Sequence, residues 1–341
     1  MRKHEPKISS NQRISLAHGS GGKLTHDLIK DCFLARFKNP ILSELTDSAI
    51  VNLKGINLAF TTDSYVIRPL FFPGGDIGKL AVYGTVNDLA VVGAKPLYIS
   101  CGYLIEEGFN SVSLDEITQS IGDAARNAGV LVVTGDTKVV EHGKGDGIFI
   151  NTSGIGVCYY QLLQDIEVGD KVLINGPIGN HEIAIISARG ELGLDVEIES
   201  DCAPLADLIS HVLTASGKIK FMRDPTRGGL ATTLNEIVTS KDLGILIEER
   251  AIPIREEVRA ACSLLGFDPL YLANEGKVVI IVGCEDASFV VDTMRAHSLG
   301  RDAQIIGEVV ESPKGRVCLR TEIGGTRIVD MPVGTLLPRI C

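Results

Sequence analysis

The sequence predicts two globular domains of α/β to α+β class, and three observations support this prediction. The chain has 341 residues, 45% of them hydrophobic, which suffices for two cores at the usual domain size of ~100–200 residues. Strand-like apolar runs alternate with helix-like patterns along most of the chain. Aromatic residues make up only 5%, whereas glycine occurs 37 times, which suits short elements joined by tight turns.

In the first half, apolar runs rich in β-formers predict strands at 56–68, 96–105, 130–140 and 148–160. Apolar spacing predicts a largely buried helix at 78–94. A second helix is expected at 113–129, where Ser113 and Glu116 form a capping-box pattern and Gly129 ends the segment. The glycine-rich segment EHGKGDG separates the last two strands, so we expect these two to form a hairpin.

In the second half, the same patterns predict strands at 171–176, 244–249, 277–283 and 304–311, and helices at 204–215, 229–240, 254–265 and 286–297. A short hairpin is expected at 312–320, and the final segment MPVGTLLPRIC has no helical or strand pattern. We therefore predict domains at 1–165 and 166–330, followed by a mobile tail at 331–341.

The net charge of −10 argues against general nucleic-acid binding, because the chain shows no basic stripe to offset it. The N-terminus has no apolar signal-like region and no apolar run reaches membrane-spanning length, so we expect a soluble cytoplasmic protein. Eight cysteines are scattered without a C-x-x-C pair or zinc-ligand spacing, which predicts core residues. Cys341 differs from them because it ends the chain.

The segment His18-Gly-Ser-Gly-Gly-Lys23 could wrap a polyphosphate, since glycines let backbone N–H groups turn toward oxygen atoms. It fits neither a Walker A loop nor G-x-G-x-x-G, so a flexible loop is the alternative.

Five aspartates stand at the ends of apolar runs: Asp47, Asp63, Asp88, Asp136 and Asp224. Mg²⁺ prefers carboxylate oxygens beside substrate phosphates, so these residues could converge on metal-bound ATP. The alternative for any one of them is a helix cap or turn residue.

Lys138 stands two residues after Asp136, so both should lie on the same strand face. Glu275 precedes an apolar strand and could act as a general base. Ordinary surface ion pairs are the alternative for both residues.

Cys341 could be a swinging carrier, because a thiolate is a strong nucleophile and its adducts stay accessible. Eleven extended residues, 331–341, would reach about 35–40 Å. The alternatives are a bystander thiol or lipidation, but prenylation requires a cysteine four residues from the end. We further expect Leu336, Leu337 and Ile340 to seat the tail in an apolar channel.

Several motifs occur in one order along nearly the whole chain: HGSGGK, TDSYVI (62–67), PLFFPGGDIGKLAVYGTVNDLAV (69–91), VTGDTKVV (133–140), RDPTRGGL (223–230), ANEGK (273–277) and a terminal PRIC. Together they resemble the HypE family of hydrogenase-maturation factors. That family belongs to the superfamily of aminoimidazole ribonucleotide synthetase, selenophosphate synthetase and thiamine-monophosphate kinase.

The resemblance implies a two-domain PurM-like fold that dimerises through the N-terminal sheet and binds ATP and Mg²⁺ at the domain and subunit junction. It further implies that a HypF-like carbamoyltransferase loads a carbamoyl group onto Cys341. The enzyme would then use ATP to dehydrate that group to a thiocyanate. A HypC-HypD-like scaffold complex would receive the cyanide for the iron of [NiFe]-hydrogenase.

By position in the motifs, the resemblance assigns catalysis to Cys341, Lys138 and Glu275, without deciding which of the last two takes which proton. It assigns metal binding to Asp63, Asp88, Asp136 and Asp224. It assigns ATP binding to His18, Gly19, Gly21, Gly22, Lys23, Asp47, Asn87, Thr134, Gly135, Thr137 and Arg227.

The sequence departs from the family at one turn, where the usual G-D-H-G reads Gly179-Asn-His-Glu182. Three alternatives remain: a small-molecule kinase, a selenophosphate synthetase-like enzyme, or a non-catalytic nucleotide-binding partner with a docking tail. A small-molecule kinase would have no use for the terminal PRIC. A selenophosphate synthetase-like enzyme would carry cysteine or selenocysteine in the loop at 18–23, and this loop contains neither.

Overall fold

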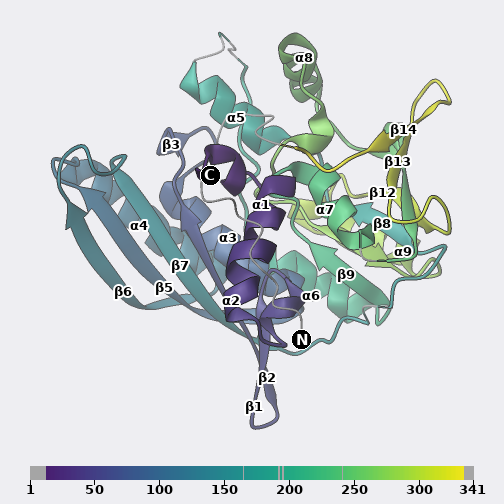
Figure 1. Cartoon of the computed structure of the whole chain (residues 1–341), viewed down its shortest axis with the longest axis horizontal. Helices are drawn as coiled ribbons and strands as arrows, with labels where there is room; N and C mark the ends of the chain where they lie inside the picture. The colour runs from purple at the N-terminus through teal and green to yellow at the C-terminus, as the bar shows by residue number, and fades with distance from the viewer. Residues whose placement is uncertain (1–12, 164, 191–192, 194–195, 240, 334–341) are drawn as a thin grey trace.

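The chain folds around two β-sheets with helices packed against them, as the computed structural model in Figure 1 shows. The structure describes residues 13–163, 165–190, 193, 196–239 and 241–333. Within these ranges, no helix combines the length and the apolar character needed to cross a membrane.

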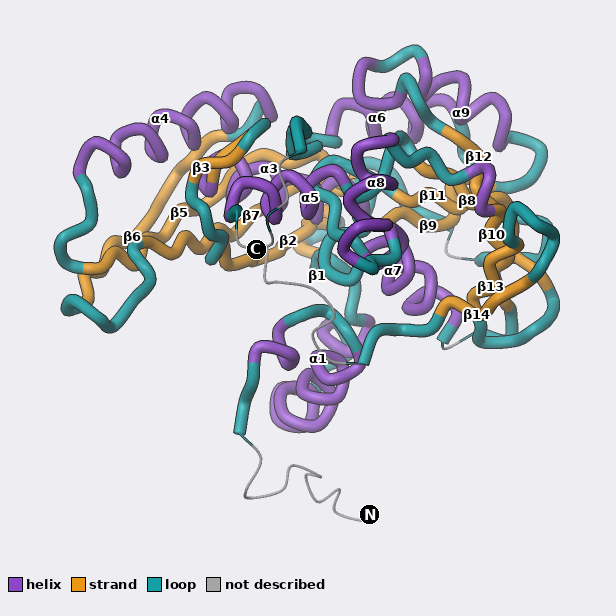
Figure 2. Tube along the Cα trace, turned by 90° about the horizontal axis from the view of Figure 1, so that it is seen from above, coloured by secondary structure: helices purple, strands orange, loops and turns teal. Residues whose placement is uncertain are grey.

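The first sheet has five strands in the order β1-β2-β7-β5-β6. Their bounds are β1 Ala49–Leu53, β2 Ile56–Tyr65, β5 Ala94–Glu106, β6 Leu131–Val140 and β7 Ile148–Cys158. A small hairpin, β3 Phe71–Phe72 and β4 Gly75–Asp76, precedes helix α3, Ile77–Val91. Figure 2 shows α3 and α4, Ser111–Ala128, on the same side of this sheet, where their apolar residues form one core with the inner face.

Two details of the first half were predicted wrongly. The N-cap of α4 is Asn110, whose side chain accepts hydrogen bonds from the backbone of Val112 and Ser113, so Ser113 and Glu116 form no capping box. Gly129 does end the helix, in the left-handed conformation at φ 69°. The strands β6 and β7 form no hairpin, because β5 lies between them, parallel to β6 and antiparallel to β7.

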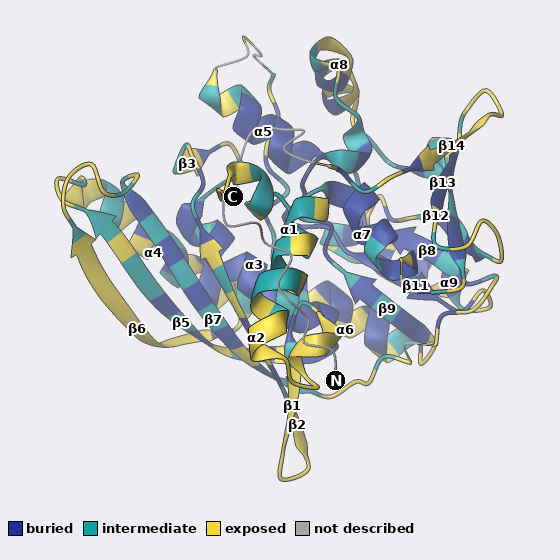
Figure 3. Ribbon diagram, viewed as in Figure 1, coloured by how far each residue is buried: buried dark blue, intermediate teal, exposed yellow. Residues whose placement is uncertain are grey.

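The outer face of the first sheet carries an exposed apolar band. Four register partners in adjacent strands form it, and each is 42% to 64% exposed: Phe60, Ile155, Tyr98 and Leu131. The edge strand β6 is exposed along nearly its whole length (Figure 3). An apolar band of this extent on a sheet face indicates an interaction surface.

The second sheet has seven strands in the order β14-β13-β10-β12-β8-β11-β9. Their bounds are β8 Lys171–Ile174, β9 Ile219–Arg223, β10 Gly244–Glu248, β11 Val279–Val282, β12 Gln304–Val310, β13 Val317–Arg320 and β14 Thr326–Val329. The apolar runs are buried on both faces, because α7, Gly229–Val238, covers one face and α6, Ala206–Ala215, and α9, Ala287–Arg295, cover the other.

The predicted strands and helices of the second half are confirmed within a few residues at their ends. The hairpin expected at 312–320 lies later, because β13 pairs antiparallel with β14. Pattern reading missed α5, Asn180–Arg189, which packs against α8, Glu256–Leu265. It also missed the N-terminal helical segment, which comprises α1 Lys23–Leu28, a π-helical turn and α2 Ala35–Phe37.

The amide of Asn87 on α3 forms hydrogen bonds between the two domains. Its Nδ2 lies 3.1 Å from the carbonyl oxygen of Ala203 and 3.4 Å from that of Glu275, and its Oδ1 accepts the N–H of Leu205 at 2.8 Å. Asn87 is almost fully buried, so these bonds fix the junction at which the acidic residues meet.

Candidate active site

Three of the predicted aspartates converge at the domain junction. Asp47 precedes β1, Asp88 lies on α3, and Asp224 directly follows β9. One carboxylate oxygen from each of the three lies within 4.8 Å of the other two. Residues from both domains therefore build one acidic cluster, as the convergence of strand and helix ends predicts.

Burial and the neighbouring negative charges disfavour the ionised forms of these carboxyl groups and raise their pKa values. Burial, with the charge of Asp47 next, raises the pKa of Asp224 to about 7. Burial also raises the pKa of Asp88 well above its usual range, and the charge of Asp224 adds to the effect. Because carboxylate oxygens suit a hard cation and a dication would relieve this repulsion, the donor set fits Mg²⁺.

Neighbouring side chains hold the acidic cluster in place. The hydroxyl of Thr61 lies 2.8 Å from Oδ2 of Asp88 and 2.9 Å from the carbonyl oxygen of Asp47. Arg223 donates to Asp47 at 2.8 Å and to Glu236 at 2.6 Å. Sequence reasoning named neither Thr61 nor Arg223 as site residues, although Arg223 is the first residue of the RDPTRGGL motif.

A small pocket beside the acidic cluster is lined by Asp63, Asp88, Asp224, Arg227 and Glu275, among others. Glu275 is 6% exposed. Burial raises the pKa of Glu275 well above its usual range, and the nearby charges of Asp224, Asp201 and Asp63 act in the same direction. A carboxyl that takes up protons this readily suits proton transfer to and from a bound group.

The glycine-rich loop lies against the same pocket through Arg227. Nη1 of Arg227 donates to the carbonyl oxygen of Gly19 at 3.0 Å, and its Nη2 lies 3.8 Å from Asp63. A Cβ at Gly21 would lie 2.9 Å from the Cβ of Arg227, and one at Gly22 would lie 2.5 Å from the carbonyl oxygen of Pro332. These contacts explain why both positions are glycine.

His18 and Lys23, at the two ends of this loop, form hydrogen bonds with backbone groups outside it. Nδ1 of His18 accepts the N–H of Ser15 at 3.1 Å, and the N–H of Lys23 donates to Pro332 at 3.0 Å. Asn87 uses its amide at the domain junction, as described above. Their assignment to ATP stays a prediction.

Asp136 and Lys138 lie away from the acidic cluster. Their side chains form an ion pair at 2.6 Å on β6, as their shared strand face predicts. The register pairs them with Gly102 and Leu104 on the outer face of the sheet, whereas Asp63 pairs with the fully buried Thr152 on the inner face. Thr134, Gly135 and Thr137 share this edge strand, so one chain alone does not bring all predicted site residues together.

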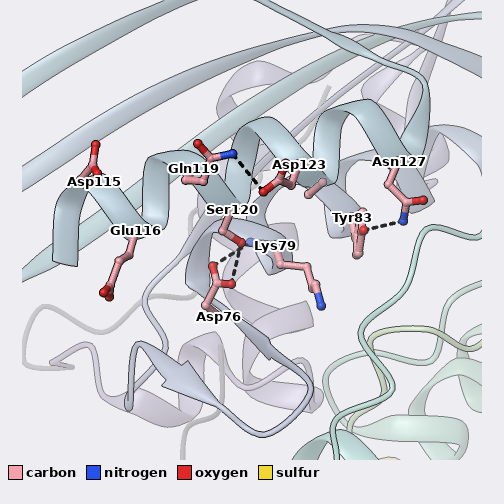
Figure 4. A pocket seen from close by; sticks show the side chains of 10 residues that line it. Asp76, Lys79, Tyr83, Asp115, Glu116, Gln119, Ser120, Asp123 and Asn127 are labelled. Carbon is pink, nitrogen blue, oxygen red and sulfur yellow. Dashed lines mark hydrogen bonds between the residues drawn. The ribbon is translucent and has the colours of Figure 1, made fainter. Parts of the chain in front are cut away.

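A second pocket lies on the opposite side of α3, between this helix and α4 (Figure 4). Its lining includes Asp76, Asp115, Glu116 and Asp123, with Lys79 as a cation among them. Asp76 is the N-cap of α3 and also accepts a hydrogen bond from Ser120 at 2.6 Å. Since its best-placed carboxylate serves as a helix cap, we assign this groove no role in catalysis.

The departing turn at 179–182 places Asn180, His181 and Glu182 in buried positions at the start of α5. Nδ1 of His181 lies 2.8 Å from the hydroxyl of Ser200, and Oε2 of Glu182 accepts the N–H of Ala273 at 2.7 Å. Burial raises the pKa of Glu182 from 4.5 to about 8.

This raised pKa predicts a pH-dependent stability. A carboxyl with a raised folded-state pKa contributes fully below its unfolded value, and that contribution is lost as pH rises from about 4.5 to about 8. Each pKa unit corresponds to ~1.4 kcal/mol, so the loss amounts to a few kcal/mol. Denaturant unfolding of Glu182→Gln and the parent chain should therefore give a stability difference that grows in favour of the variant over this range. An unchanged difference would contradict the assignment.

The terminal residues Leu336, Leu337, Ile340 and Cys341 lie outside the described residues. Their predicted roles in the tail remain predictions. The tail begins at a defined place, however, because Tyr271 donates to the carbonyl oxygen of Asp330 at 2.9 Å and Lys23 donates to that of Pro332.

Both halves of the chain match known families. Residues 45–158 match the family described as AIR synthase related protein, N-terminal domain, and residues 167–320 match its C-terminal domain. The carbamoyl dehydratase HypE of Cupriavidus necator is 49% identical over 333 residues, covering 96% of this chain and 95% of that relative.

Two solved structures show the same fold. A crystal structure of a HypE-HypF complex superposes with a TM-score of 0.85 and 49% identity, covering 89% of this chain and 99% of that one. A HypE structure in complex with ATP gives a TM-score of 0.80 and 46% identity, covering 96% and 100%. The predicted two-domain PurM-like fold is thereby confirmed. The chain, with its acidic cluster at the domain junction, belongs to the HypE family of carbamoyl dehydratases.

Proposed function

We propose that the chain dehydrates an S-carbamoyl group on Cys341 to an S-cyanide at the expense of ATP, supplying cyanide ligands for the iron of [NiFe]-hydrogenase. Membership of the carbamoyl dehydratase family supports the reaction. The observation that carries the assignment to this site is the acidic cluster with Glu275 beside it, since it supplies both phosphate-metal and proton-transfer chemistry in one pocket.

ATP binding is supported by the HypE structure in complex with ATP. In this chain, the glycine-rich loop, Arg227 and the acidic cluster adjoin one pocket. Asp47, Asp88 and Asp224 would hold Mg²⁺, with Asp63 beside them. When bound, the ion would neutralise phosphate charge and polarise the transferring phosphoryl group.

The proposed reaction balances without an additional reactant. The carbamoyl oxygen takes the γ-phosphoryl group from ATP, the carbamoyl nitrogen gives up one proton, and ADP leaves. The C–O bond then breaks as the nitrogen gives up its second proton, so phosphate departs and a C≡N group remains on sulfur. We assign assistance of these steps to Glu275 and Lys138 as a pair. Glu275 is buried beside the pocket and as a carboxylate can accept a proton, whereas the ammonium of Lys138, paired with Asp136, can stabilise the charge on the phosphate, which carries the second proton away.

Lys138 can take part only if a second copy completes the site. We therefore propose a homodimer formed through the outer face of the first sheet, which displays the apolar band and the Asp136–Lys138 pair together. Burial of such a band would exclude water from four apolar side chains at once.

A single charge in the centre of this band should disrupt the dimer. Ile155→Asp places a carboxylate among Phe60 and Tyr98, so light scattering should show the monomer mass at micromolar concentration. The matched control is Ile323→Asp, which alters a residue that is 96% exposed in the turn before β14 and should leave the mass unchanged. Identical masses for the two variants would refute the proposed interface.

The partners follow from the chemistry of the tail. The HypE-HypF complex supports a HypF-like carbamoyltransferase as the source of the carbamoyl group. A HypC-HypD-like scaffold complex is proposed as the acceptor of cyanide, because the cyanide on sulfur has to reach an iron site outside this chain.

Phosphate release tests the proposed function. A chain carrying the carbamoyl group on Cys341 should release a stoichiometric amount of phosphate when Mg²⁺ and ATP are added, measured by rapid-quench assay. The same chain without the carbamoyl group should release far less in that time, because no acceptor oxygen is present. Equal release from both forms would indicate a simple ATPase and refute the proposal.

A further inference from the structure

The first turn of α5 and the segment that carries Glu275 are joined by reciprocal hydrogen bonds. Oε2 of Glu182, on α5, accepts the N–H of Ala273 at 2.7 Å. In return, Oδ1 of Asn274 accepts the N–H of Gly179 at 2.8 Å. Two adjacent residues immediately before Glu275 are thereby tied to one helix end, and all the atoms involved are buried.

Asn274 also joins this segment to the loop that carries Asp224. Its Nδ2 lies 2.9 Å from the carbonyl oxygen of Pro225, the residue after Asp224, and its backbone N–H donates to the same oxygen at 3.2 Å. Asp224 and Glu275 line the same pocket. The bonds of Asn274 therefore hold together the two loops that carry these carboxyls.

We infer that Glu182 and Asn274 are positioning residues for Glu275, which fix its carboxyl relative to Asp224 from the first turn of α5. The inference rests on the proposed function, in which Glu275 exchanges a proton with the carbamoyl nitrogen. It also gives the departing turn at 179–182 a role, because a glycine at position 182 would leave the N–H of Ala273 without this acceptor.

Loss of this acceptor should change the position of Glu275. A buried N–H without a hydrogen-bond partner is unfavourable, so the segment that carries it should shift toward another acceptor. A displacement of ~1 Å at a reacting group can lower the rate about 100-fold. Glutamine should replace Glu182 well, because its amide oxygen can accept the same bond and the raised pKa leaves the native carboxyl largely neutral near pH 7.

The experiment compares Glu182→Ala, Glu182→Gln and Asn274→Ala in the full chain, loaded with carbamoyl on Cys341. We expect the single-turnover rate constant for phosphate release to fall at least ~10-fold in both alanine variants, with the half-saturating ATP concentration changed less than ~3-fold, and Glu182→Gln to retain a near-parental rate constant. Asn235→Ala is the matched control, because Asn235 is also a buried asparagine, and its amide donates to the carbonyl oxygens of Ala231 and Val329, neither of which adjoins Glu275.

Two results would overturn the inference: a parental rate constant in Glu182→Ala, or an equal fall of the rate constant in Asn235→Ala at matched loss of unfolding free energy. Failure of the proposed function has a different signature. If the proposed function is wrong, Glu275→Gln, measured in parallel, should keep the parental rate of phosphate release. If only the positioning role is wrong, Glu275→Gln should still lose this activity.

Discussion

Replacement of Cys341 by alanine is expected to abolish carbamoyl loading and the cyanide yield while leaving ATP binding unchanged. The thiolate is the nucleophile that accepts the carbamoyl group, and no other atom of the variant can carry it at the end of the tail. ATP binding should persist because the acidic cluster, the glycine-rich loop and Arg227 all lie in the folded domains. The measurements are incorporation of labelled carbamoyl and ATP titration by calorimetry.

The matched control is Cys284→Ala. Cys284 is exposed and lies after β11, outside both pockets, so its thiol tests whether any accessible cysteine can be loaded. We expect parental loading in this variant. Carbamoyl incorporation that survives in Cys341→Ala and disappears in Cys284→Ala would place the carrier elsewhere.

Glu275→Gln is expected to lower the single-turnover rate constant for dehydration by about 100-fold to 10,000-fold, the usual contribution of a general acid-base group. The amide has the same shape but neither takes nor gives the proton, so the rate constant falls whereas the half-saturating ATP concentration should change little. Because burial and neighbouring acids raise the pKa of Glu275, removal of its charge should also leave the chain at least as stable at neutral pH. Single-turnover kinetics and denaturant unfolding measure the two effects.

Glu182→Gln serves as the matched control for this substitution. Glu182 and Glu275 are both buried glutamates with a raised pKa, but only Glu275 lines the pocket beside the acidic cluster. Loss of activity in Glu275→Gln alone therefore reports proton transfer. A similar loss in both variants would show that any charge removal at the junction has this effect, and the catalytic role of Glu275 would be refuted.

The sequence predicts the elements well where local signals agree with packing. The apolar spacing at 78–94 predicts the helix α3, which is buried at most of its positions. The short apolar runs of β8 and β11 predict strands, and both strands are buried on both faces. The N-cap of α4 shows the limit of such signals. Asn110 and Ser113 are both favourable N-cap residues. Which of them begins the helix depends on where the chain leaves β5, and in the structure the N-cap is Asn110.

Pairing between strands depends on the whole sheet rather than on the turn. The segment EHGKGDG has hairpin composition, yet β5 pairs with both β6 and β7 and separates them. The local sequence contains no information about this third strand. The parallel β5–β6 pair instead connects through α4, as crossover connections usually do.

The candidate site was predictable in part. Asp47, Asp88 and Asp224 lie together, as their places at the ends of apolar runs predict, because residues at strand and helix ends meet where two domains adjoin. The hydrogen-bonding roles of Glu182 and Asn274 could not be predicted, since they arise from contacts between segments more than ninety residues apart in sequence. The separation of Lys138 from the acidic cluster appears only in the folded chain.

The most direct test of the account is the mass of the C-terminal peptide. The chain is loaded with a HypF-like carbamoyltransferase and carbamoyl phosphate, freed of nucleotide, and then treated with Mg²⁺ and ATP before digestion. We predict a carbamoyl adduct on Cys341 that loses the mass of one water after ATP is added, and only then. An adduct that persists unchanged while ATP is hydrolysed would contradict the proposed dehydration.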